Sequence, residues 1–236
     1  MCYSNAISSN VVQLAQSYKK GMALVPDHLL PIYFSSGFSL PLWPCITEKD
    51  DIICMNWGLV PSWYRGQAIH EIASKTLNAR VETLQDKASF KHLIRSKRCI
   101  IPSTGFFEYQ LNGNQKKPFF IYPKNAMFFH MAGLYDSWIH TGTRETYTGF
   151  TIVTTEANSL MAGIHNTKKR MPLLLNASEI LSYLHGEIDF NSLHTLDEEG
   201  MCAHPVDKRI IMRSNHNVPE VQHLFNDNIG TQGVLF

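Results

Sequence analysis

The hydrophobic positions of this chain fall mostly in short runs bounded by glycine, proline and polar residues. These runs are rich in β-branched and aromatic side chains, a composition typical of strands. They predict strands over residues 51–59, 98–101, 105–110, 119–122, 127–135, 148–155 and 170–175. Polar turn residues at 110–118, centred on Asn112 and Gly113, and at 141–145 predict two hairpin turns.

Apolar residues at helical spacing are less frequent. They predict helices over residues 11–20 and 86–95, the second capped by Asp86, and shorter helices over 158–164 and 178–184. The predicted strands come in runs and do not alternate with helices. We therefore expect an α+β fold with a largely antiparallel, curled and barrel-like sheet, peripheral helices, and one domain over residues 1–236.

The composition limits the kind of partner. Lys and Arg number 21 and Asp and Glu number 20, so the formal net charge of the 236 residues is +1. This balance excludes a broadly basic surface, and any nucleic-acid binding must come from a local groove. The start of the chain has no signal-peptide pattern, and no apolar run approaches the roughly 20 residues of a membrane helix. We expect a cytoplasmic protein and a monomer.

The cysteines and histidines give no sign of a metal site. The five cysteines form no C-x-x-C pair, which is typical of a reduced intracellular protein. Cys45, Cys54 and Cys99 lie in apolar runs, and we expect them to be buried structural thiols. No ligand spacing for zinc is present among the eleven histidines, so we expect neither a metal nor a cofactor.

Cys2 is the first candidate for chemistry. Initiator methionine is normally removed before a small residue, and its removal would leave a cysteine with a free thiol and a free α-amine. Their ordinary pKa values, about 8.5 and about 8, leave useful fractions of both nucleophiles at neutral pH. An aldehyde would condense with the amine and then be attacked by the neighbouring thiolate, which closes a five-membered thiazolidine ring. The alternative is an incidental cysteine at a frayed terminus.

Glu108 and His165 are candidates for proton transfer. Glu108 stands in the aromatic run Gly105–Tyr109, where burial would raise the pKa of its carboxyl and suit it to acid/base catalysis. Alternation along a strand equally allows Glu108 to point to solvent. His165 precedes a predicted strand and could transfer protons near neutral pH, or it could be a plain surface histidine.

Further polar and aromatic residues suit contacts with a nucleic acid. Asn78 can donate and accept hydrogen bonds, and Arg80 can bind a phosphate through two nitrogens, although both are also ordinary turn residues. Trp63 follows Trp57 across a Gly/Pro turn and could stack on a base, while such a pair is more often part of the core. Three basic residues in a row could pair with phosphates or form a solvated face: Lys168, Lys169 and Arg170.

Seven blocks occur in a fixed order and give the chain a family resemblance. They are Met1-Cys2, W-G-L-V-P-S-W at 57–63, N-A-R-x-E at 78–82, C-I-I-P at 99–102, G-F-F-E-Y at 105–109, T-T-E-A-N at 154–158 and H-x4-R-M-P at 165–172. The pattern resembles the SOS response-associated peptidase (SRAP) family from residue 2 to about residue 175. The region beyond residue 175 matches weakly, and we assign it no catalytic role.

The resemblance implies a fold and a reaction. The fold is a compact α+β domain with a curled sheet and a positive groove that leads to the cysteine. Cys2 is the family's nucleophile, which crosslinks to the ring-opened aldehyde of abasic sites in single-stranded DNA, and DNA junctions are a further candidate partner. Asn78 orients the amine and the sugar, Glu108 acts as acid and base, and His165 assists proton transfer at the sugar oxygen.

The resemblance also assigns Arg80 and Trp63 to positions that hold the DNA backbone and bases. Two departures from the family pattern concern DNA contacts. A Gly-Arg pair often follows the cysteine in the family, whereas Tyr3 and Ser4 follow it here, and the loop between His165 and Arg170 is longer. Two other functions stay open on the sequence: a thiol peptidase or amidohydrolase that uses Cys2, including removal of its own Met1, and a non-catalytic single-strand-binding module.

Overall fold

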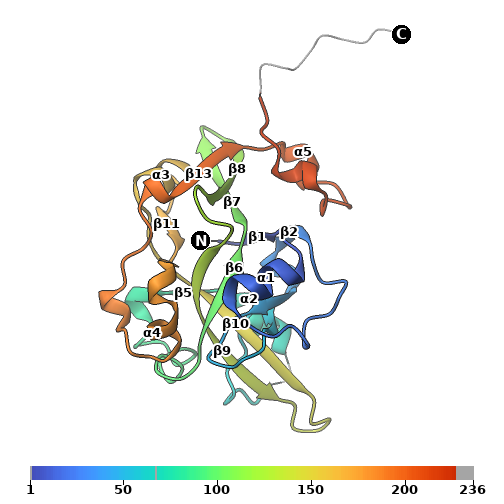
Figure 1. The fold of residues 1–236 in the computed structure, drawn as a ribbon, viewed down its shortest axis with the longest axis vertical. Helices are drawn as coiled ribbons and strands as arrows, with labels where there is room; N and C mark the ends of the chain where they lie inside the picture. The colour runs from blue at the N-terminus through green and yellow to red at the C-terminus, as the bar shows by residue number, and fades with distance from the viewer. Residues whose placement is uncertain (1, 67, 227–236) are drawn as a thin grey trace.

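The computed structural model describes residues 2–66 and 68–226, and it has an α+β architecture (Figure 1). Within these residues the strands form two sheets, with the orders β13-β8-β7-β1-β2 and β12-β9-β10-β4-β3. Three further strands join the second sheet, since β5 and β11 pair with β10 and β6 pairs with β9. Both strand orders are open. None of the helices in the described part of the chain is long and apolar enough to cross a membrane.

The strands of the first sheet are all antiparallel to their neighbours. They are β1 (Ser4–Ile7), β2 (Ile32–Ser36), β7 (Gly105–Asn112), β8 (Gln115–Pro123) and β13 (Met201–Pro205). β7 and β8 form the hairpin predicted at residues 110–118, and Gly113 takes a positive φ of 56° in its turn. The sequence did not predict β1, β2 or β13, which are short and take their pairing from distant parts of the chain.

The second sheet is built around the long hairpin of β9 and β10, which extends to the bottom of Figure 1. Its strands are β3 (Leu42–Cys45), β4 (Ile53–Trp57), β5 (Asn78–Arg80), β6 (Arg98–Ser103), β9 (Phe129–Ile139), β10 (Thr146–Glu156), β11 (Arg170–Pro172) and β12 (Leu174–Leu175). β10 pairs in parallel with β4 and β5, and the other pairs are antiparallel. The expected α+β class with mainly antiparallel pairing is therefore confirmed.

The helices are short and lie outside the sheets (Figure 1). They are α1 (Val11–Tyr18), α2 (Ile69–Lys75), α3 (Ser159–Ile164), α4 (Ile180–Leu184) and α5 (Lys208–Ile211). The 3-10 turns are η1 (Gly37–Ser39), η2 (Val81–Thr83), η3 (Ala177–Glu179), η4 (Phe190–Ser192), η5 (Glu198–Gly200) and η6 (Pro219–Gln222). α1 begins as its sequence indicates, because Asn10 and Gln13 form a reciprocal capping box.

The predicted helix over residues 86–95 is wrong, and the segment forms a series of turns. Its backbone hydrogen bonds span three residues at Phe90 and Leu93 and four residues at Lys91 and Lys97, so no continuous helical ladder develops. Its apolar residues Phe90, Leu93 and Ile94 nevertheless pack on the core. The helical spacing correctly predicted which residues are buried, but a series of turns buries them as well as a helix would.

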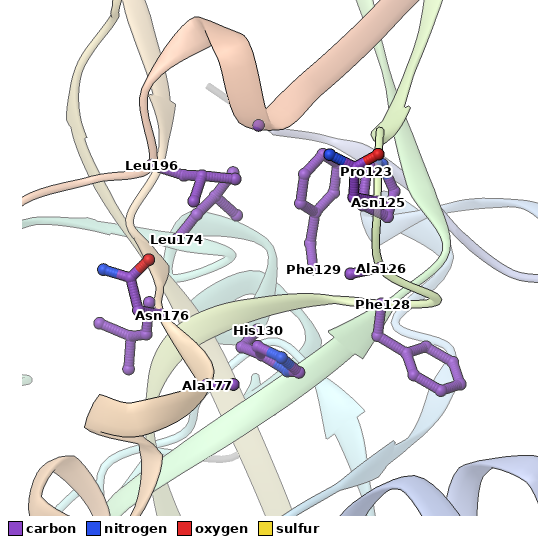
Figure 2. A pocket seen from close by; sticks show the side chains of 12 residues that line it. Pro123, Asn125, Ala126, Phe128, Phe129, His130, Leu174, Asn176, Ala177 and Leu196 are labelled. Carbon is purple, nitrogen blue, oxygen red and sulfur yellow. The ribbon is translucent and has the colours of Figure 1, made fainter.

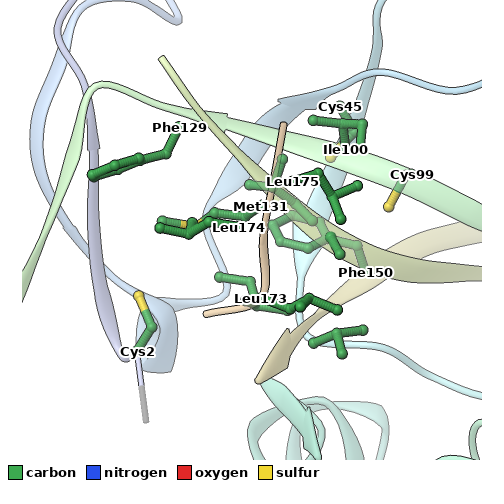
Figure 3. Packing of buried hydrophobic residues seen from close by; sticks show 14 of the residues in the cluster. Cys2, Cys45, Cys99, Ile100, Phe129, Met131, Phe150, Leu173, Leu174 and Leu175 are labelled. Atoms are coloured by element: carbon green, nitrogen blue, oxygen red, sulfur yellow. The ribbon is translucent and has the colours of Figure 1, made fainter. Parts of the chain in front are cut away.

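The main hydrophobic cluster lies mostly around the second sheet and contains Cys45 and Cys99 as expected, while Cys54 is half-buried. A second cluster, which includes Phe34, Phe107 and Phe120, belongs to the first sheet. Cys2 lies at one side of the drawn part of the main cluster, and Cys45 and Cys99 lie at the other (Figure 3). The amino-terminal cysteine is therefore set apart from the structural thiols.

Candidate active site

The candidate site begins where β1 lies against β7. Ser4 pairs with Phe107 in antiparallel register, so the residues just before β1 run alongside Glu108 and Tyr109. Cys2 has no exposed surface, and its Sγ donates to the Ser4 carbonyl at 3.8 Å. Burial, reinforced by the negative charge of Glu108, raises the pKa of the Cys2 thiol well above its ordinary value. The Cys2 side chain is thus an uncharged thiol under the influence of a carboxyl group.

Glu108 points inward, which resolves the choice that alternation left open. Phe106 belongs to the main cluster and Phe107 to the second cluster, so the next side chain, Glu108, returns to the side of the main core. Glu108 is only 5% exposed. Burial raises the pKa of Glu108 to about 7. At neutral pH this carboxyl is divided between its acid and base forms, which suits proton transfer in both directions.

Asn78 connects the N-A-R block to the amino-terminal cysteine. It opens β5, which is held in place by parallel pairing of Asn78 with Ile152 on β10. Its Nδ2 donates to the Cys2 carbonyl at 2.8 Å, across 76 positions of sequence. Its buried Oδ1 has no hydrogen-bond partner among the described residues. One end of this amide therefore fixes the Cys2 backbone, and the other offers an acceptor to a bound group.

His165 follows α3 and is buried, with 8% of its surface exposed. Its Nδ1 lies 2.8 Å from the carbonyl oxygen of Arg170 and 3.3 Å from the Arg170 backbone nitrogen. Because a carbonyl oxygen can only accept a hydrogen bond, the shorter contact assigns the proton to Nδ1 and the lone pair to Nε2. Burial lowers the pKa of His165, with the positive charges of Lys168 and Arg170 acting in the same direction. His165 is therefore a neutral imidazole with its basic nitrogen at Nε2.

Two amide side chains join the His165 loop to the strand that carries Glu108. Asn166 accepts from the Leu111 backbone nitrogen at 3.0 Å and donates to the Leu111 carbonyl at 2.8 Å. Gln110 donates to the Gly163 carbonyl at 3.0 Å. These contacts tie α3 and its loop to β7. Nothing in the sequence signalled this role for Asn166, because Asn is common in loops for other reasons.

Arg170 is placed differently from the expected phosphate contact. It is 8% exposed, and its guanidinium donates to the two carboxylate oxygens of Glu82 at 2.6 and 3.0 Å and to the Thr154 carbonyl at 2.7 Å. Although partial burial opposes it, the hydrogen bond from Arg170 holds the pKa of Glu82 below its ordinary value. This ion pair joins the N-A-R-x-E block to the R-M-P block and supports the scaffold beneath Asn78 and His165.

The remaining predicted residues lie on the surface. Arg80, Lys168 and Lys169 are exposed, and Lys169 has a positive φ of 48°. The two tryptophans of the W-G-L-V-P-S-W block separate: Trp57 is fully buried, whereas Trp63 is 48% exposed. Gly58 makes the turn between them possible, because its φ is 131° and a Cβ there would lie 2.9 Å from the Ala73 carbonyl oxygen.

The loop that carries Trp63 is anchored by residues that no sequence motif marked as functional. Asp136 is buried and accepts from the Ser62 backbone nitrogen at 2.7 Å. The indole of Trp138 donates to the Tyr64 carbonyl at 2.8 Å, and the indole of Trp63 donates to the Ala88 carbonyl at 3.3 Å. These bonds hold Trp63 with its ring partly open to solvent. A lone aspartate directly after the predicted strand at 127–135 was the one available signal.

The structure thus brings Cys2, Asn78 and Glu108 together and ties the His165 loop to the same strand. A hollow of about 230 Å³ between the start of β9 and β12 lies elsewhere (Figure 2). Phe129, His130 and Leu174 are among its lining residues, and of the described residues that line it none is a predicted site residue. Across residues 2–66 and 68–226, no group of three or more His, Cys, Asp or Glu could hold a metal ion.

A buried thiol, a carboxyl with a pKa near neutrality and a neutral imidazole on an α+β scaffold define a candidate site for covalent thiol chemistry. The family is shown by the sequence: the model of the SOS response associated peptidase (SRAP) family matches residues 3–212, and the chain belongs to this family. A solved structure of a protein from Bacteroides thetaiotaomicron matches this structure with a TM-score of 0.91 and is 35% identical in sequence. The match covers 95% of this chain and 100% of the Bacteroides chain.

Two curated relatives carry a descriptive name. Abasic site processing protein YoqW of Bacillus subtilis (strain 168) is 36% identical over 173 residues, which are 71% of this chain and 74% of that protein. Abasic site processing protein HMCES of Xenopus tropicalis is 30% identical over 194 residues, which are 72% of this chain and 56% of that protein. The match therefore spans little more than half of the Xenopus relative.

Proposed function

We propose that this protein is a covalent sensor of abasic sites in single-stranded DNA, with Cys2 as the nucleophile once Met1 has been removed. The names of the relatives support the choice of lesion. The observation that carries the proposal is the 2.8 Å hydrogen bond from Asn78 to the Cys2 carbonyl. It fixes the amino-terminal cysteine beside a buried carboxyl, where an ordinary chain terminus would be free to move.

The reaction joins one aldehyde to two neighbouring nucleophiles. The α-amine of Cys2 adds to the aldehyde carbon of the ring-opened sugar, and loss of one water gives an imine. The Cys2 sulfur then adds to the imine carbon, its proton passes to the imine nitrogen, and a five-membered thiazolidine results. No oxidant or leaving group other than water is needed. Because both nucleophiles belong to one residue, the second step is intramolecular and is favoured by proximity.

Glu108 supplies the proton transfers at the sulfur and at the departing water. A carboxyl with a pKa of about 7 can take the thiol proton and return a proton in the next step. This help is needed because burial raises the pKa of Cys2, so little thiolate forms without a nearby base. The reverse sequence of proton transfers opens the thiazolidine and releases the DNA.

His165 acts on the sugar. The closed form of an abasic sugar is a hemiacetal, and its opening to the aldehyde requires a proton shift at the ring oxygen. The Nδ1 proton of His165 is directed to the Arg170 carbonyl, so Nε2 is the nitrogen that exchanges protons with the substrate. Asn78 places its open Oδ1 to accept a hydrogen bond from the Cys2 amine or from a sugar hydroxyl.

The charges of the site favour this reaction over hydrolysis of peptides. A thiol hydrolase activates its cysteine by lowering the pKa of the thiol, usually next to a protonated histidine. Here burial raises the pKa of Cys2 and lowers the pKa of His165, so a thiolate–imidazolium pair is disfavoured.

Four exposed side chains are proposed to contact the DNA. Arg80, Lys168 and Lys169 would bind phosphates, and Trp63 would stack on a base. Arg170 has a different role, because its ion pair with Glu82 supports the scaffold.

The test is formation of a covalent adduct. Protein whose intact mass shows loss of Met1 is mixed with a single-stranded oligonucleotide that contains one abasic site, and products are separated on a denaturing gel. We expect an adduct that requires both Cys2 and the lesion, with Cys2→Ala and an undamaged oligonucleotide as controls. Absence of an adduct would overturn the proposal. Cys2-dependent cleavage of a peptide library would favour the hydrolase, and unchanged binding by Cys2→Ala without any adduct would favour a non-catalytic binding module.

A further inference from the structure

Two aromatic rings lie together at the residue that follows the nucleophile. Tyr3 stacks on Phe38, with ring centroids 5.0 Å apart and ring planes inclined by 30°. Tyr3 is half-buried, whereas Phe38 is 55% exposed, one of the larger exposed apolar side chains in the described part of the chain. A large ring that is held in a stack and still faces water is a ready surface for another flat apolar group.

The fold holds Phe38 in place. Ser4 pairs with Ser36, and the Gly37 backbone nitrogen donates to the Tyr3 carbonyl at 2.8 Å, so η1 is attached to the chain directly after Cys2. Gly37 lies on the buried Trp57, since a Cβ there would be 3.0 Å from its indole ring. The position of Phe38 is therefore set by backbone hydrogen bonds and by the core, and binding a ligand there requires little ordering.

The charges around Tyr3 show that this stack borders the candidate site. Burial and the negative charge of Glu108 raise the pKa of Tyr3, and the positive charge of Arg80 acts in the opposite direction. The Tyr3 hydroxyl thus lies within electrostatic reach of the carboxyl that serves Cys2 and of a proposed phosphate contact. No basic side chain occurs in the segment from Cys2 to Ser4 that could take a phosphate there.

We propose that Tyr3 and Phe38 form a stacking site for the nucleobase adjacent to the abasic site, an inference that rests on the proposed function. Every base has a π-face, so such a site accepts any sequence, and a purine gains most because its ring surface is larger. The missing base of the lesion leaves its neighbour without one stacking partner, and the Tyr3–Phe38 stack would replace that partner. DNA binding at the Tyr3–Phe38 stack then depends on ring contact and changes little with salt concentration.

The experiment compares adduct rates on three oligonucleotides at protein concentrations below saturation. The reactive abasic site is flanked by adenines, by thymines, or by tetrahydrofuran spacers, which lack a base and cannot react with Cys2. We expect the wild-type rate to follow the order adenine, thymine, spacer. Phe38→Ala should lower the rate on the adenine-flanked oligonucleotide about tenfold and leave the rate on the spacer-flanked one nearly unchanged. Phe38→Tyr, which keeps the ring, should restore the adenine rate.

The matched control is Leu181→Ala on α4, because Leu181 is also a large exposed apolar side chain, with 65% of its surface exposed. An equal loss by Phe38→Ala on all three oligonucleotides, or no loss on any, would overturn the stacking site. Failure of the proposed function is distinguishable, because wild-type protein would then form no adduct at all. In that case, fluorescence anisotropy with an unreactive tetrahydrofuran oligonucleotide flanked by adenines measures the stacking site without the reaction: tenfold weaker binding by Phe38→Ala supports it, and equal binding contradicts it.

Discussion

Replacement of Glu108 by glutamine tests the central electrostatic feature of the site through protein stability. Burial raises the pKa of this carboxyl from 4.5 to about 7. The interval corresponds to about 3 kcal/mol, because each pH unit is worth about 1.4 kcal/mol. The folded protein prefers the neutral carboxyl by that amount. A glutamine side chain at this position would have nearly the same shape and no charge at any pH, so it would avoid the penalty altogether.

The sign of the effect follows from proton binding. Between pH 4.5 and 7 the folded state keeps its proton on Glu108 while the unfolded state has released it. The free energy of unfolding therefore falls as pH rises through this interval. The contribution of Glu108 is fully present below pH 4.5 and is lost above pH 7. Relative to wild type, Glu108→Gln should gain stability with rising pH, by up to about 3 kcal/mol at pH 8.

The assay is urea unfolding of both proteins at several pH values from 4.5 to 8, with the difference in unfolding free energy plotted against pH. Taking the difference removes the titration of all other groups. The control is Glu220→Gln, which makes the same substitution at an exposed glutamate. A plot for Glu108→Gln that is flat within about 0.5 kcal/mol would contradict the raised pKa of Glu108, because the carboxyl would then be ionised in the folded protein at neutral pH.

Three further predictions concern neighbouring residues. Asn78→Ala should slow adduct formation about fivefold, the worth of one hydrogen bond to the Cys2 carbonyl, and should leave DNA affinity in an anisotropy assay unchanged; equal losses in both assays would contradict its assigned role. Glu82→Gln should lower the unfolding free energy by about 1 kcal/mol, since Glu82 is 44% exposed and its pair with Arg170 is partly screened; Glu71→Gln, in an exposed pair, is the control in the same urea titration. Combined replacement of Lys168 by alanine and Lys169 by glycine, which accepts a φ of 48°, should lower the slope of the salt dependence of single-strand binding by about 1.4, because each lysine contributes about 0.7; an unchanged slope would remove both lysines from the interface.

The local parts of the fold were predictable from the sequence. Strands β7 to β10 contain enough β-branched and aromatic residues to be predicted from composition, and Asn112-Gly113 marks the hairpin between β7 and β8. The short strand β5 was not predictable, because Asn78–Arg80 takes its extended form from parallel pairing with β10. Residues 86–95 show the opposite case, in which helical spacing is present and only turns form.

The candidate site was likewise predictable only in part. The identity of Cys2, Asn78, Glu108 and His165 could be read from motifs, but the side of the strand to which Glu108 points could not. That choice depends on which face of the first sheet the rest of the chain covers. For Arg170, residue type alone gave the wrong expectation, because an arginine beside two lysines suggests phosphate binding. Its partner Glu82 lies 88 positions away, and only the fold brings the two together.

The longer loop between His165 and Arg170 is the departure from the family pattern that could most affect the chemistry. The structure shows how its added length is absorbed: the Lys169 nitrogen donates to the His165 carbonyl at 2.8 Å, and the His165 ring reaches the Arg170 carbonyl at the same distance. Asn166 binds the Leu111 backbone as a neighbouring strand would. The extra residues thus project Lys168 and Lys169 outward while both ends of the loop stay fixed. The loop therefore adds two exposed cationic side chains, while its own hydrogen bonds hold the imidazole in place.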